Sequence, residues 1–274
     1  MRTGDAASLI MQSEVFWPYF AGTAAISVTG AIAARKEVLL ARGADKIVSL
    51  GRLFYAMPLA VFAAEHFTAT KEIARIVPRW IPGATFWTYF VGTALIAAAL
   101  SIVTRKHGRW SGTLLALMFC LFVVLLHIPN VLADPKDRVA WAVALRDLSF
   151  SGGALAFAGM QTEEWRAKGK HALIEVGRIF IAVPTLFFAV VQLLHPDLVP
   201  GVPLARQTPP WIPGRIFWSY LAGVLFLVAG ARLLMRRQPR RAAIGLGIMV
   251  LALIVAVYLP IWGANLFDIQ NGLN

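Results

Sequence analysis

Cysteine, charge and the motifs of soluble enzymes are scarce or missing in this sequence. The one cysteine, Cys120, lies inside an apolar run, which excludes disulfides within the chain, thiolate-bound iron–sulfur clusters and cysteine-rich zinc sites. The sequence has no glycine-rich phosphate loop, serine nucleophile elbow, HExxH zinc motif or CxxC pair. These motifs carry much of soluble enzyme chemistry, so their absence favours a non-catalytic role.

Charged residues make up only 15% of the 274 residues, whereas 58% are hydrophobic and the mean hydropathy is +0.68. Soluble proteins carry about 25% charged residues, so this composition predicts an integral membrane protein. The net charge of +12 does not indicate nucleic acid, because the basic residues lie in short loops where topology and anionic headgroups explain them. The lipid bilayer is the expected partner, and no cleaved signal peptide is expected.

Eight apolar runs approach the roughly 20 residues that a helix needs to cross a bilayer. They predict an all-α fold, a polytopic bundle of about eight transmembrane helices. The expected spans are 15–34, 50–67, 84–103, 112–128, 141–160, 174–194, 216–235 and 242–261. A short amphipathic helix is expected after Phe67, because Ile73, Ile76 and Val77 fall on one helical face.

Basic residues are more frequent in the loops after spans one, three, five and seven than in the other loops. These richer loops hold Arg35, Lys36, Arg42, Lys46, Arg105, Lys106, Arg109, Arg166, Lys168, Lys170, Arg232, Arg236, Arg237, Arg240 and Arg241. Loops rich in lysine and arginine stay in the cytoplasm. We therefore expect a multi-pass protein of the cell (inner) membrane with both termini outside the cytoplasm.

Two parts of the sequence repeat the same signals in the same order. The motif Gly51-Arg52-x-Phe54-x-Ala56-x-Pro58 returns 126 residues later at Gly177–Pro184, Trp80–Gly83 returns 131 residues later at Trp211–Gly214, and His127 aligns with Tyr258, also at 131. This pattern predicts two four-helix repeats. The first covers residues 1–160 and the second, more degenerate one covers residues 161–274.

Span one leaves the boundary between the repeats open. Residues 16–24 match residues 86–94 at an offset of 70, so spans one, three and seven are related. The units are either spans one to four and five to eight, or spans two to five followed by a second unit that borrows span one. Four-helix repeats keep one orientation in both cases, so the repeats are expected to be parallel.

The sequence resembles the DoxX-like family of small four-helix bacterial membrane proteins. The points of likeness are an arginine that opens the first helix of a unit (Arg52, Arg178), a proline-bearing loop into a second helix and an arginine-containing turn into a third (Arg105, Arg236). Some members are associated with membrane oxidoreductases that pass electrons to quinone. The resemblance implies a tandem-duplicated, eight-helix member with an accessory role in a membrane redox complex.

Five ionisable residues are expected at one level near the outer surface: Glu65, His66, His127, Arg146 and Asp147. In the second repeat the first three are replaced by Val191, Gln192 and Tyr258. Ionisable groups inside a membrane face the bundle and find partners, so the cluster predicts a pocket that binds a lipid headgroup or a quinone carbonyl and exchanges protons through a histidine. The structural alternative is an ion pair of Arg146 with Asp147 or Glu65, with the histidines solvated.

Two further hypotheses concern other ligands. His66 and His127 are candidate haem ligands, less favoured because the sequence does not show that they face one cavity, and no other metal site is indicated. Arg52 and Arg178 open spans at the cytoplasmic side, where arginine side chains reach lipid headgroups. They are therefore candidate lipid ligands.

Three functions remain open on these observations. The favoured one is a non-catalytic subunit or accessory of a membrane redox or envelope complex, which contacts other subunits and binds quinone or lipid in the outer polar pocket. The repeats and the paired prolines Pro58 and Pro184 also fit a small-molecule or lipid transporter or flippase. The third is a haem- or quinone-dependent membrane oxidoreductase.

Overall fold

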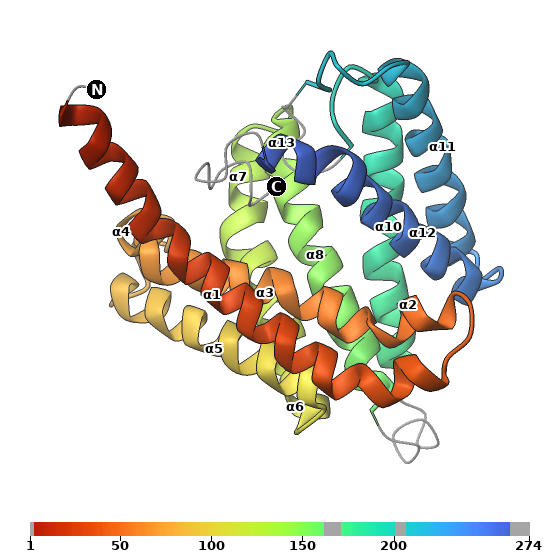
Figure 1. The fold of residues 1–274 in the computed structure, drawn as a ribbon, viewed down its shortest axis with the longest axis horizontal. Coiled ribbons are helices and arrows are strands. Elements are labelled where there is room, and N and C mark those ends of the chain that lie inside the picture. Colours follow the sequence, from red (N-terminus) through yellow and green to blue (C-terminus); the bar gives the residue numbers. More distant parts are fainter. Residues whose placement is uncertain (1–2, 162–170, 201–206, 264–274) are drawn as a thin grey trace. The chain divides into compact units, whose positions relative to one another are not determined.

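The structure is a computed structural model that describes residues 3–161, 171–200 and 207–263. These residues are almost entirely helical (Figure 1), and the only β interaction among them is an isolated bridge between Leu198 and Gln207. A helix satisfies its backbone donors and acceptors internally, which a lipid environment requires. The predicted all-α fold is confirmed.

The helical elements follow the chain as α1 (Thr3–Leu40), α2 (Asp45–Ser49), α3 (Gly51–Thr68), α4 (Thr70–Ala74), α5 (Ala84–Thr104), α6 (Gly108–Phe122), η1 (Val123–His127), α7 (Ile128–Ala133), α8 (Arg138–Gly159), α10 (His171–Leu194), α11 (Arg215–Leu234), α12 (Pro239–Leu253), η2 (Ile254–Tyr258) and α13 (Leu259–Gly263). Elements η1 and η2 are wider π-helical turns. Each continues directly from one α-helix into the next.

Five stretches of helix are long and apolar enough to cross a membrane, judged by length and composition. They are Ala84–Thr104, Gly108–Ala133, Ala172–Leu194, Arg215–Leu234 and Pro239–Ile261. They coincide with five of the eight expected spans and are consistent with a multi-pass membrane protein. Helices α1, α3 and α8 form over the other three, but α3 and α8 carry charged residues such as Arg52 and Arg146. That these three also cross the membrane stays a prediction.

Contacts divide the chain into two compact units. The first holds the chain up to Leu115 together with residues from Ile261, and the second holds Ala116–Pro260. The boundary at Leu115 falls inside α6. This division describes packing, whereas the boundary expected after residue 160 describes duplication and stays a prediction.

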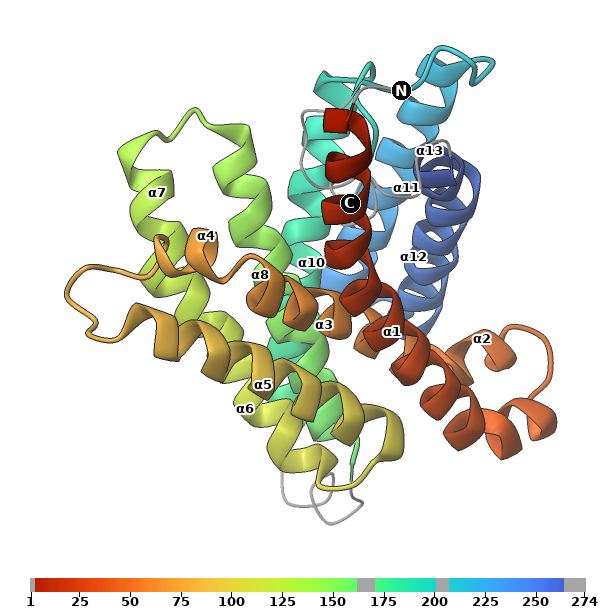
Figure 2. The same ribbon diagram turned by 60° about the vertical axis from the view of Figure 1, so that its left-hand side comes forward.

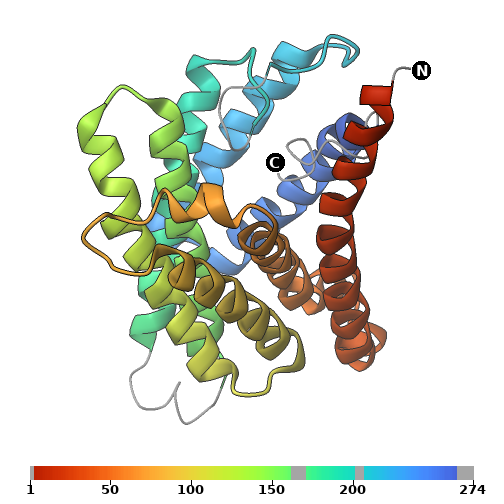
Figure 3. The same cartoon turned by 90° about the vertical axis from the view of Figure 1, so that its left-hand side faces the viewer.

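In the first unit, α1, α3 and α5 pack on one another (Figure 3). Gly30 of α1 permits this approach, because an added Cβ would lie 2.7 Å from Leu53 Cδ1 of α3 and 3.3 Å from Val103 Cγ1 of α5. Small residues at helix crossings are the usual means of close packing in membranes. The short α4 forms in the segment after Phe67 where an amphipathic helix is expected.

In the second unit, α10 packs against both α8 and α11. Helices α8 and α10 cross where two glycines face each other: an added Cβ on Gly177 would lie 2.5 Å from Gly152 O, and one on Gly152 would lie 2.7 Å from Gly177 O. A short turn links α7 to α8 (Figure 2), and α8 packs against η1. This hairpin positions the side chains considered next.

Several backbone features recur 131 residues apart. The π-helical turns η1 and η2 do so, and each is followed by a proline in the next helix. Left-handed backbone recurs in three pairs, Gly83 (φ 75°) with Gly214 (φ 64°), Arg105 (φ 60°) with Arg236 (φ 58°) and His107 (φ 56°) with Gln238 (φ 49°). Such φ values are uncommon for residues other than glycine, so their recurrence at one spacing is a specific likeness between the two segments.

Candidate functional site

His127 is the last residue of the π-helical turn η1 and lies two residues before Pro129. A proline cannot donate a hydrogen bond to the turn that precedes it, and the helix widens in that turn. Such π turns are rare in proteins and frequent at functional sites. The backbone at His127 therefore differs from that of an ordinary apolar helix.

Asp147 joins His127 to Arg146. Its carboxylate accepts a hydrogen bond from His127 Nε2 at 2.8 Å and another from Arg146 Nε at 3.0 Å. The Asp147 side chain is 5% exposed, that of His127 15% and that of Arg146 35%. A buried carboxylate needs such partners, because an unpaired one costs several kcal/mol. The structure thus brings these three residues together.

The turn between α7 and α8 positions the pair. Asp137 caps α8, and its carboxylate accepts hydrogen bonds from the backbone N–H groups of Val139 (2.8 Å) and Ala140 (3.2 Å), which would otherwise lack partners at a helix start. Trp141 Nε1 donates to the carbonyl of Pro135 at 3.0 Å and closes the same turn. Because α8 then packs on η1, Asp147 lies opposite His127.

The hydrogen bond to Asp147 determines which atom of His127 can act on a ligand. Since Nε2–H is donated to the carboxylate, Nδ1 is the remaining ring nitrogen. In the neutral ring Nδ1 accepts a hydrogen bond, and in the imidazolium it donates one. His127 therefore has Nδ1 as the ring atom that can bond to a ligand.

Glu65 and His66 lie near the end of α3 in the first unit and are half-buried. His66 Nδ1 donates to the carbonyl of Phe62 at 2.7 Å, so in the neutral ring Nε2 is the acceptor. Gly92 of α5 packs closely here, because an added Cβ would lie 3.0 Å from both His66 Cβ and the Phe67 ring. This packing fixes the His66 side chain at the α3–α5 crossing.

The five residues of the predicted cluster therefore belong to both units. Glu65 and His66 are in the first unit, whereas His127, Arg146 and Asp147 are in the second. The meeting of all five stays a prediction. Arg146 pairs with Asp147, as the structural alternative expects, but His127 is bonded to the same carboxylate rather than simply solvated.

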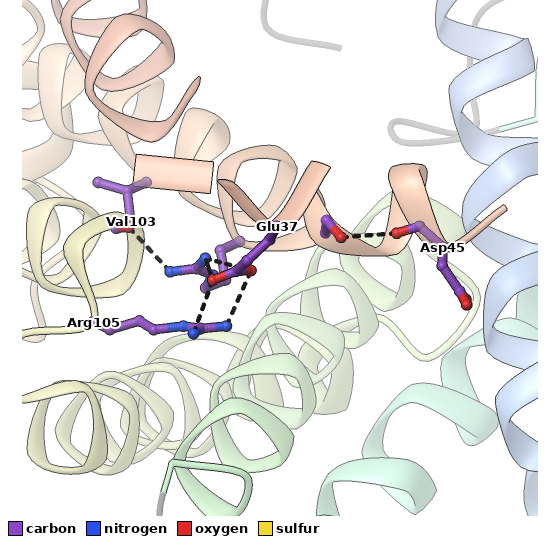
Figure 4. Close-up of polar contacts among 6 residues, drawn as sticks. Glu37, Asp45, Val103 and Arg105 are labelled. Atoms are coloured by element: carbon purple, nitrogen blue, oxygen red, sulfur yellow. Dashed lines mark hydrogen bonds and ion pairs between the residues drawn. The ribbon is translucent and has the colours of Figure 1, made fainter. Parts of the chain in front are cut away.

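Arg52, at the start of α3, is held by protein groups. Its guanidinium donates to both carboxylate oxygens of Glu37, at 3.0 and 2.9 Å, and to the carbonyl of Val103 at 3.2 Å. Arg105 pairs with the same Glu37 carboxylate at 2.9 Å (Figure 4). The Arg52 side chain is only 14% exposed, so in this conformation it faces protein more than a lipid headgroup.

Arg178 forms a similar cluster in the second unit. It donates to Glu175 Oε2 from Nε (3.0 Å) and Nη2 (2.8 Å), and it also donates to the carbonyls of Leu233 and Leu234. Arg236 pairs with the other oxygen of Glu175 at 3.0 Å. In both clusters one carboxylate lies between two arginines, and a buried arginine reaches the end of a helix, where a cation is favourable.

Sequence reasoning misses the two carboxylates of these clusters. Span one is expected to end at Ala34, which leaves Glu37 in a loop, whereas α1 continues to Leu40. Glu175 lies three residues before Arg178, a spacing at which helical side chains meet. That spacing is a signal that could have identified the second cluster.

A family model described as Domain of unknown function (DUF8561) matches residues 55–148. The matched segment contains Glu65, His66, His127, Arg146 and Asp147 but neither Arg52 nor Arg178. No curated protein and no solved structure matches the chain. The similarity groups the five residues of the predicted cluster in one segment and names no activity.

Proposed function

We propose that this protein is a multi-pass protein of the inner membrane, built from two parallel four-helix repeats, with both termini outside the cytoplasm. It serves as a non-catalytic subunit or accessory of a membrane complex and binds a quinone or a lipid in its first repeat. The observation that carries the binding proposal is the hydrogen bond between His127 and the buried Asp147, at the end of a π-helical turn. The resemblance to DoxX-like proteins agrees with this role.

The exposed surface of the helices supports the membrane location. Large apolar side chains are prominent on it, among them Phe86 and Phe217, each 63% exposed, and Val255, also 63% exposed. In water a large apolar surface favours association or aggregation. In a bilayer the same side chains face lipid tails, and their exposure then carries no free-energy penalty.

The paired backbone features support the duplication. Both segments have a π turn before a proline, a left-handed glycine before a helix and a left-handed arginine after it, at a constant spacing of 131 residues. The buried arginines Arg52 and Arg178 also make the same kinds of contact, with a shared carboxylate and with the end of α5 or α11. Two copies of one unit explain this correspondence more simply than independent origins.

The difference between the copies supports a site in the first one. Tyr258 stands where the first repeat has His127, and a tyrosine hydroxyl does not change its charge near neutral pH. The His127 side chain is 15% exposed, and we propose that the ligand contacts this exposed part. The proposed site thus has an imidazole, held in place by Asp147, where the second repeat has a phenol.

The two states of His127 suit the two states of a quinone. A quinone carbonyl accepts a hydrogen bond from the protonated Nδ1, and a quinol hydroxyl donates one to the neutral Nδ1. Asp147 keeps the ring in one orientation in both cases. If the ligand is a lipid, the guanidinium of Arg146 is the group that pairs with the headgroup phosphate, because the Arg146 side chain is 35% exposed.

Co-purification tests the proposed function. The tagged protein is isolated from its own membranes in a mild detergent, and bound proteins, quinones and phospholipids are identified by mass spectrometry. We expect a partner subunit and a stoichiometric quinone or lipid, with the small molecule lost in His127→Tyr. A monomer free of ligand and partner would contradict the proposal.

A further inference from the structure

Helices α1, α3 and α5 of the first unit (Figure 1) leave a partly open cleft of about 430 Å³ among them. Every residue that lines the cleft is apolar, and several are small, so the three helices do not fill the space. The lining includes Gly22 and Ala25 of α1, Ala60 and Ala64 of α3, and Ile96 and Leu100 of α5. Small-molecule sites have volumes of about 300–1,000 Å³, so the cleft is large enough for a ligand.

One end of the cleft is polar. Pro18 of α1 and Phe67 of α3 line the cleft there, and the hydroxyl groups of the next residues, Tyr19 and Thr68, are hydrogen-bonded at 3.0 Å. Thr68 Oγ1 donates its own proton to the carbonyl of Ala64 at 2.9 Å, so Tyr19 is the donor to Thr68. The Tyr19 oxygen then remains as an acceptor.

Glu65 adds a carboxylate to the same end of the cleft. It lies three residues before Thr68, a spacing at which helical side chains are neighbours, and it is close enough to Tyr19 for the two side chains to interact electrostatically. Glu65 is half-buried, and within the described part of the chain its carboxylate has no hydrogen bond and no ion pair. Since an acidic group in a membrane protein normally finds a partner, this end of the cleft calls for a cationic donor.

Exposed aromatic residues indicate the level of this polar end in the membrane. Trp17, next to Pro18, is 58% exposed, and Trp87 of α5 is 41% exposed. Helix α5 is adjacent to α3 at this end, because the ring centroids of Phe67 and Tyr89 are 5.9 Å apart. Tryptophan and tyrosine favour the boundary between headgroups and hydrocarbon. In the proposed membrane location, the polar end therefore lies at the headgroups and the apolar part of the cleft lies in the hydrocarbon.

We propose that the cleft binds a phospholipid whose headgroup ends in a primary ammonium, with an acyl chain between the three helices and the ammonium at Glu65 and Tyr19. An acyl chain suits the apolar lining, because an apolar cavity stays dry and an empty one lacks dispersion contacts. An ammonium group has three donors and no acceptor, so it complements the two acceptors. The inference rests on the proposed membrane location and goes beyond the site at His127, which belongs to the other unit.

The test is lipid binding to the full-length protein, delipidated in detergent and measured by native mass spectrometry with dioleoyl lipids. Phosphatidylethanolamine is compared with phosphatidylcholine, whose methylated nitrogen has no donor, and with phosphatidylglycerol, which has no cation. We expect phosphatidylethanolamine to bind about tenfold or more tightly than the other two, the equivalent of one charge-assisted hydrogen bond. Equal binding of the three lipids would overturn the ammonium contact.

Two substitutions test the two parts of the site, each with a matched control. Ala25→Phe fills the cleft from an exposed position of α1, and Ala31→Phe, also exposed on α1 but outside the cleft, is its control. Glu65→Gln keeps the shape and removes the charge, and Glu72→Gln, at an exposed position of α4, is its control. We expect Ala25→Phe to bind all three lipids weakly, Glu65→Gln to bind them equally and both controls to resemble the wild type. Wild-type binding in folded Ala25→Phe would overturn the cleft, and a wild-type preference in folded Glu65→Gln would overturn the ammonium contact.

Crosslinking locates the bound chain directly. Phosphatidylethanolamine with a diazirine on its acyl chain should label peptides of α1, α3 and α5, and labelling confined to other helices would overturn the cleft. Circular dichroism checks that each variant keeps its helical content. If Ala25→Phe does not fold, Gly22→Val replaces it, because the nearest atom that an added Cβ at Gly22 would meet is Ala60 O at 3.9 Å.

The outcomes separate this inference from the proposed function. His127 does not line the cleft, so His127→Tyr should still bind phosphatidylethanolamine there. If Ala25→Phe and Glu65→Gln bind lipid as the wild type does while His127→Tyr loses its ligand, the cleft site fails and the proposed function stands. If the cleft binds its lipid but His127→Tyr loses nothing, the site at His127 fails and this inference stands. A protein that is found outside the membrane fraction would overturn both.

Discussion

Gly51 and Gly177 open the two occurrences of the same sequence motif but should respond oppositely to alanine. An added Cβ on Gly177 would lie 2.5 Å from Gly152 O and 2.9 Å from Ala156 N, both backbone atoms of α8. Around Gly51, at the start of α3, nothing lies within 4 Å. The same substitution therefore tests a close helix crossing at one position and open space at the other.

The expected magnitude follows from these distances. Ordinary contact begins at 3.4 Å, so α8 and α10 must separate by about 0.9 Å to admit the methyl group of Gly177→Ala. Overpacking of this kind costs about 1–3 kcal/mol, and backbone atoms cannot rotate away. After the gain of about 0.5–1 kcal/mol for replacing a helical glycine, we expect Gly177→Ala to lower the free energy of unfolding by about 1 kcal/mol, and by about 2.5 kcal/mol at most. Gly51→Ala should raise it by up to about 0.5–1 kcal/mol.

The measurement is unfolding by sodium dodecyl sulfate in mixed micelles, followed by circular dichroism. Gly152→Ala, whose Cβ would lie 2.7 Å from Gly177 O, should resemble Gly177→Ala. Equal effects of alanine at Gly51 and Gly177, in either direction, would refute the close crossing of α8 and α10.

Three further predictions concern the arginine clusters, the helix starts and the topology. Glu37→Gln and Glu175→Gln each leave two arginines without their carboxylate and should lower the free energy of unfolding by about 1–3 kcal/mol, between the values for surface and buried pairs. Arg52→Gln should lower the free energy of unfolding more than Arg105→Gln does, because the Arg52 side chain is 14% exposed and that of Arg105 is 55% exposed. Equal losses of stability in these two variants would argue against the buried contact of Arg52. Gly83→Ala and Gly214→Ala should each lower the free energy of unfolding by about 1–2 kcal/mol, because they place a side chain on left-handed backbone. Gly245→Ala is the control: nothing lies within 4 Å of an added Cβ there, so stability should be unchanged or higher. Similar thermal stabilities for all three variants would be inconsistent with the left-handed φ values of Gly83 and Gly214. In a Cys120→Ser background, Val38→Cys and His107→Cys should react with an impermeant thiol reagent only from the cytoplasmic side, and labelling from outside would reject the orientation.

Much of the fold follows from the sequence because apolar runs and loop signals are local. The runs locate α5, α10, α11 and α12 closely, and Gly83 and Gly214 mark helix starts at which the backbone is left-handed. The π turns cannot be predicted in this way, because a helix that widens for one turn leaves the apolar pattern unchanged. The end of α1 is also missed, since the charged residues Arg35–Glu37 interrupt the apolar run after Ala34 while the helix continues through them to Leu40.

The candidate site is only partly visible in the sequence. The presence of Tyr258 at the position that aligns with His127 and the scarcity of ionisable residues in apolar runs indicate which residues matter. The hydrogen bond of His127 to Asp147 depends on how the α7–α8 turn aligns two helices, which no local pattern encodes. The carboxylates Glu37 and Glu175 come from different places in their repeats, so alignment of the copies does not identify them.

Binding of a short-chain ubiquinone to His127→Tyr, compared with the wild type, tests the central claim most directly. Tyrosine is the residue that the second repeat carries at this position, and Asp147 keeps Arg146 as a partner, so the variant should fold with an unchanged thermal transition. We expect the affinity of this variant for ubiquinone to fall at least about tenfold, the equivalent of losing one hydrogen bond of about 1.4 kcal/mol. Unchanged binding in a folded His127→Tyr protein would contradict the claim, and loss of the fold would assign the cluster to structure.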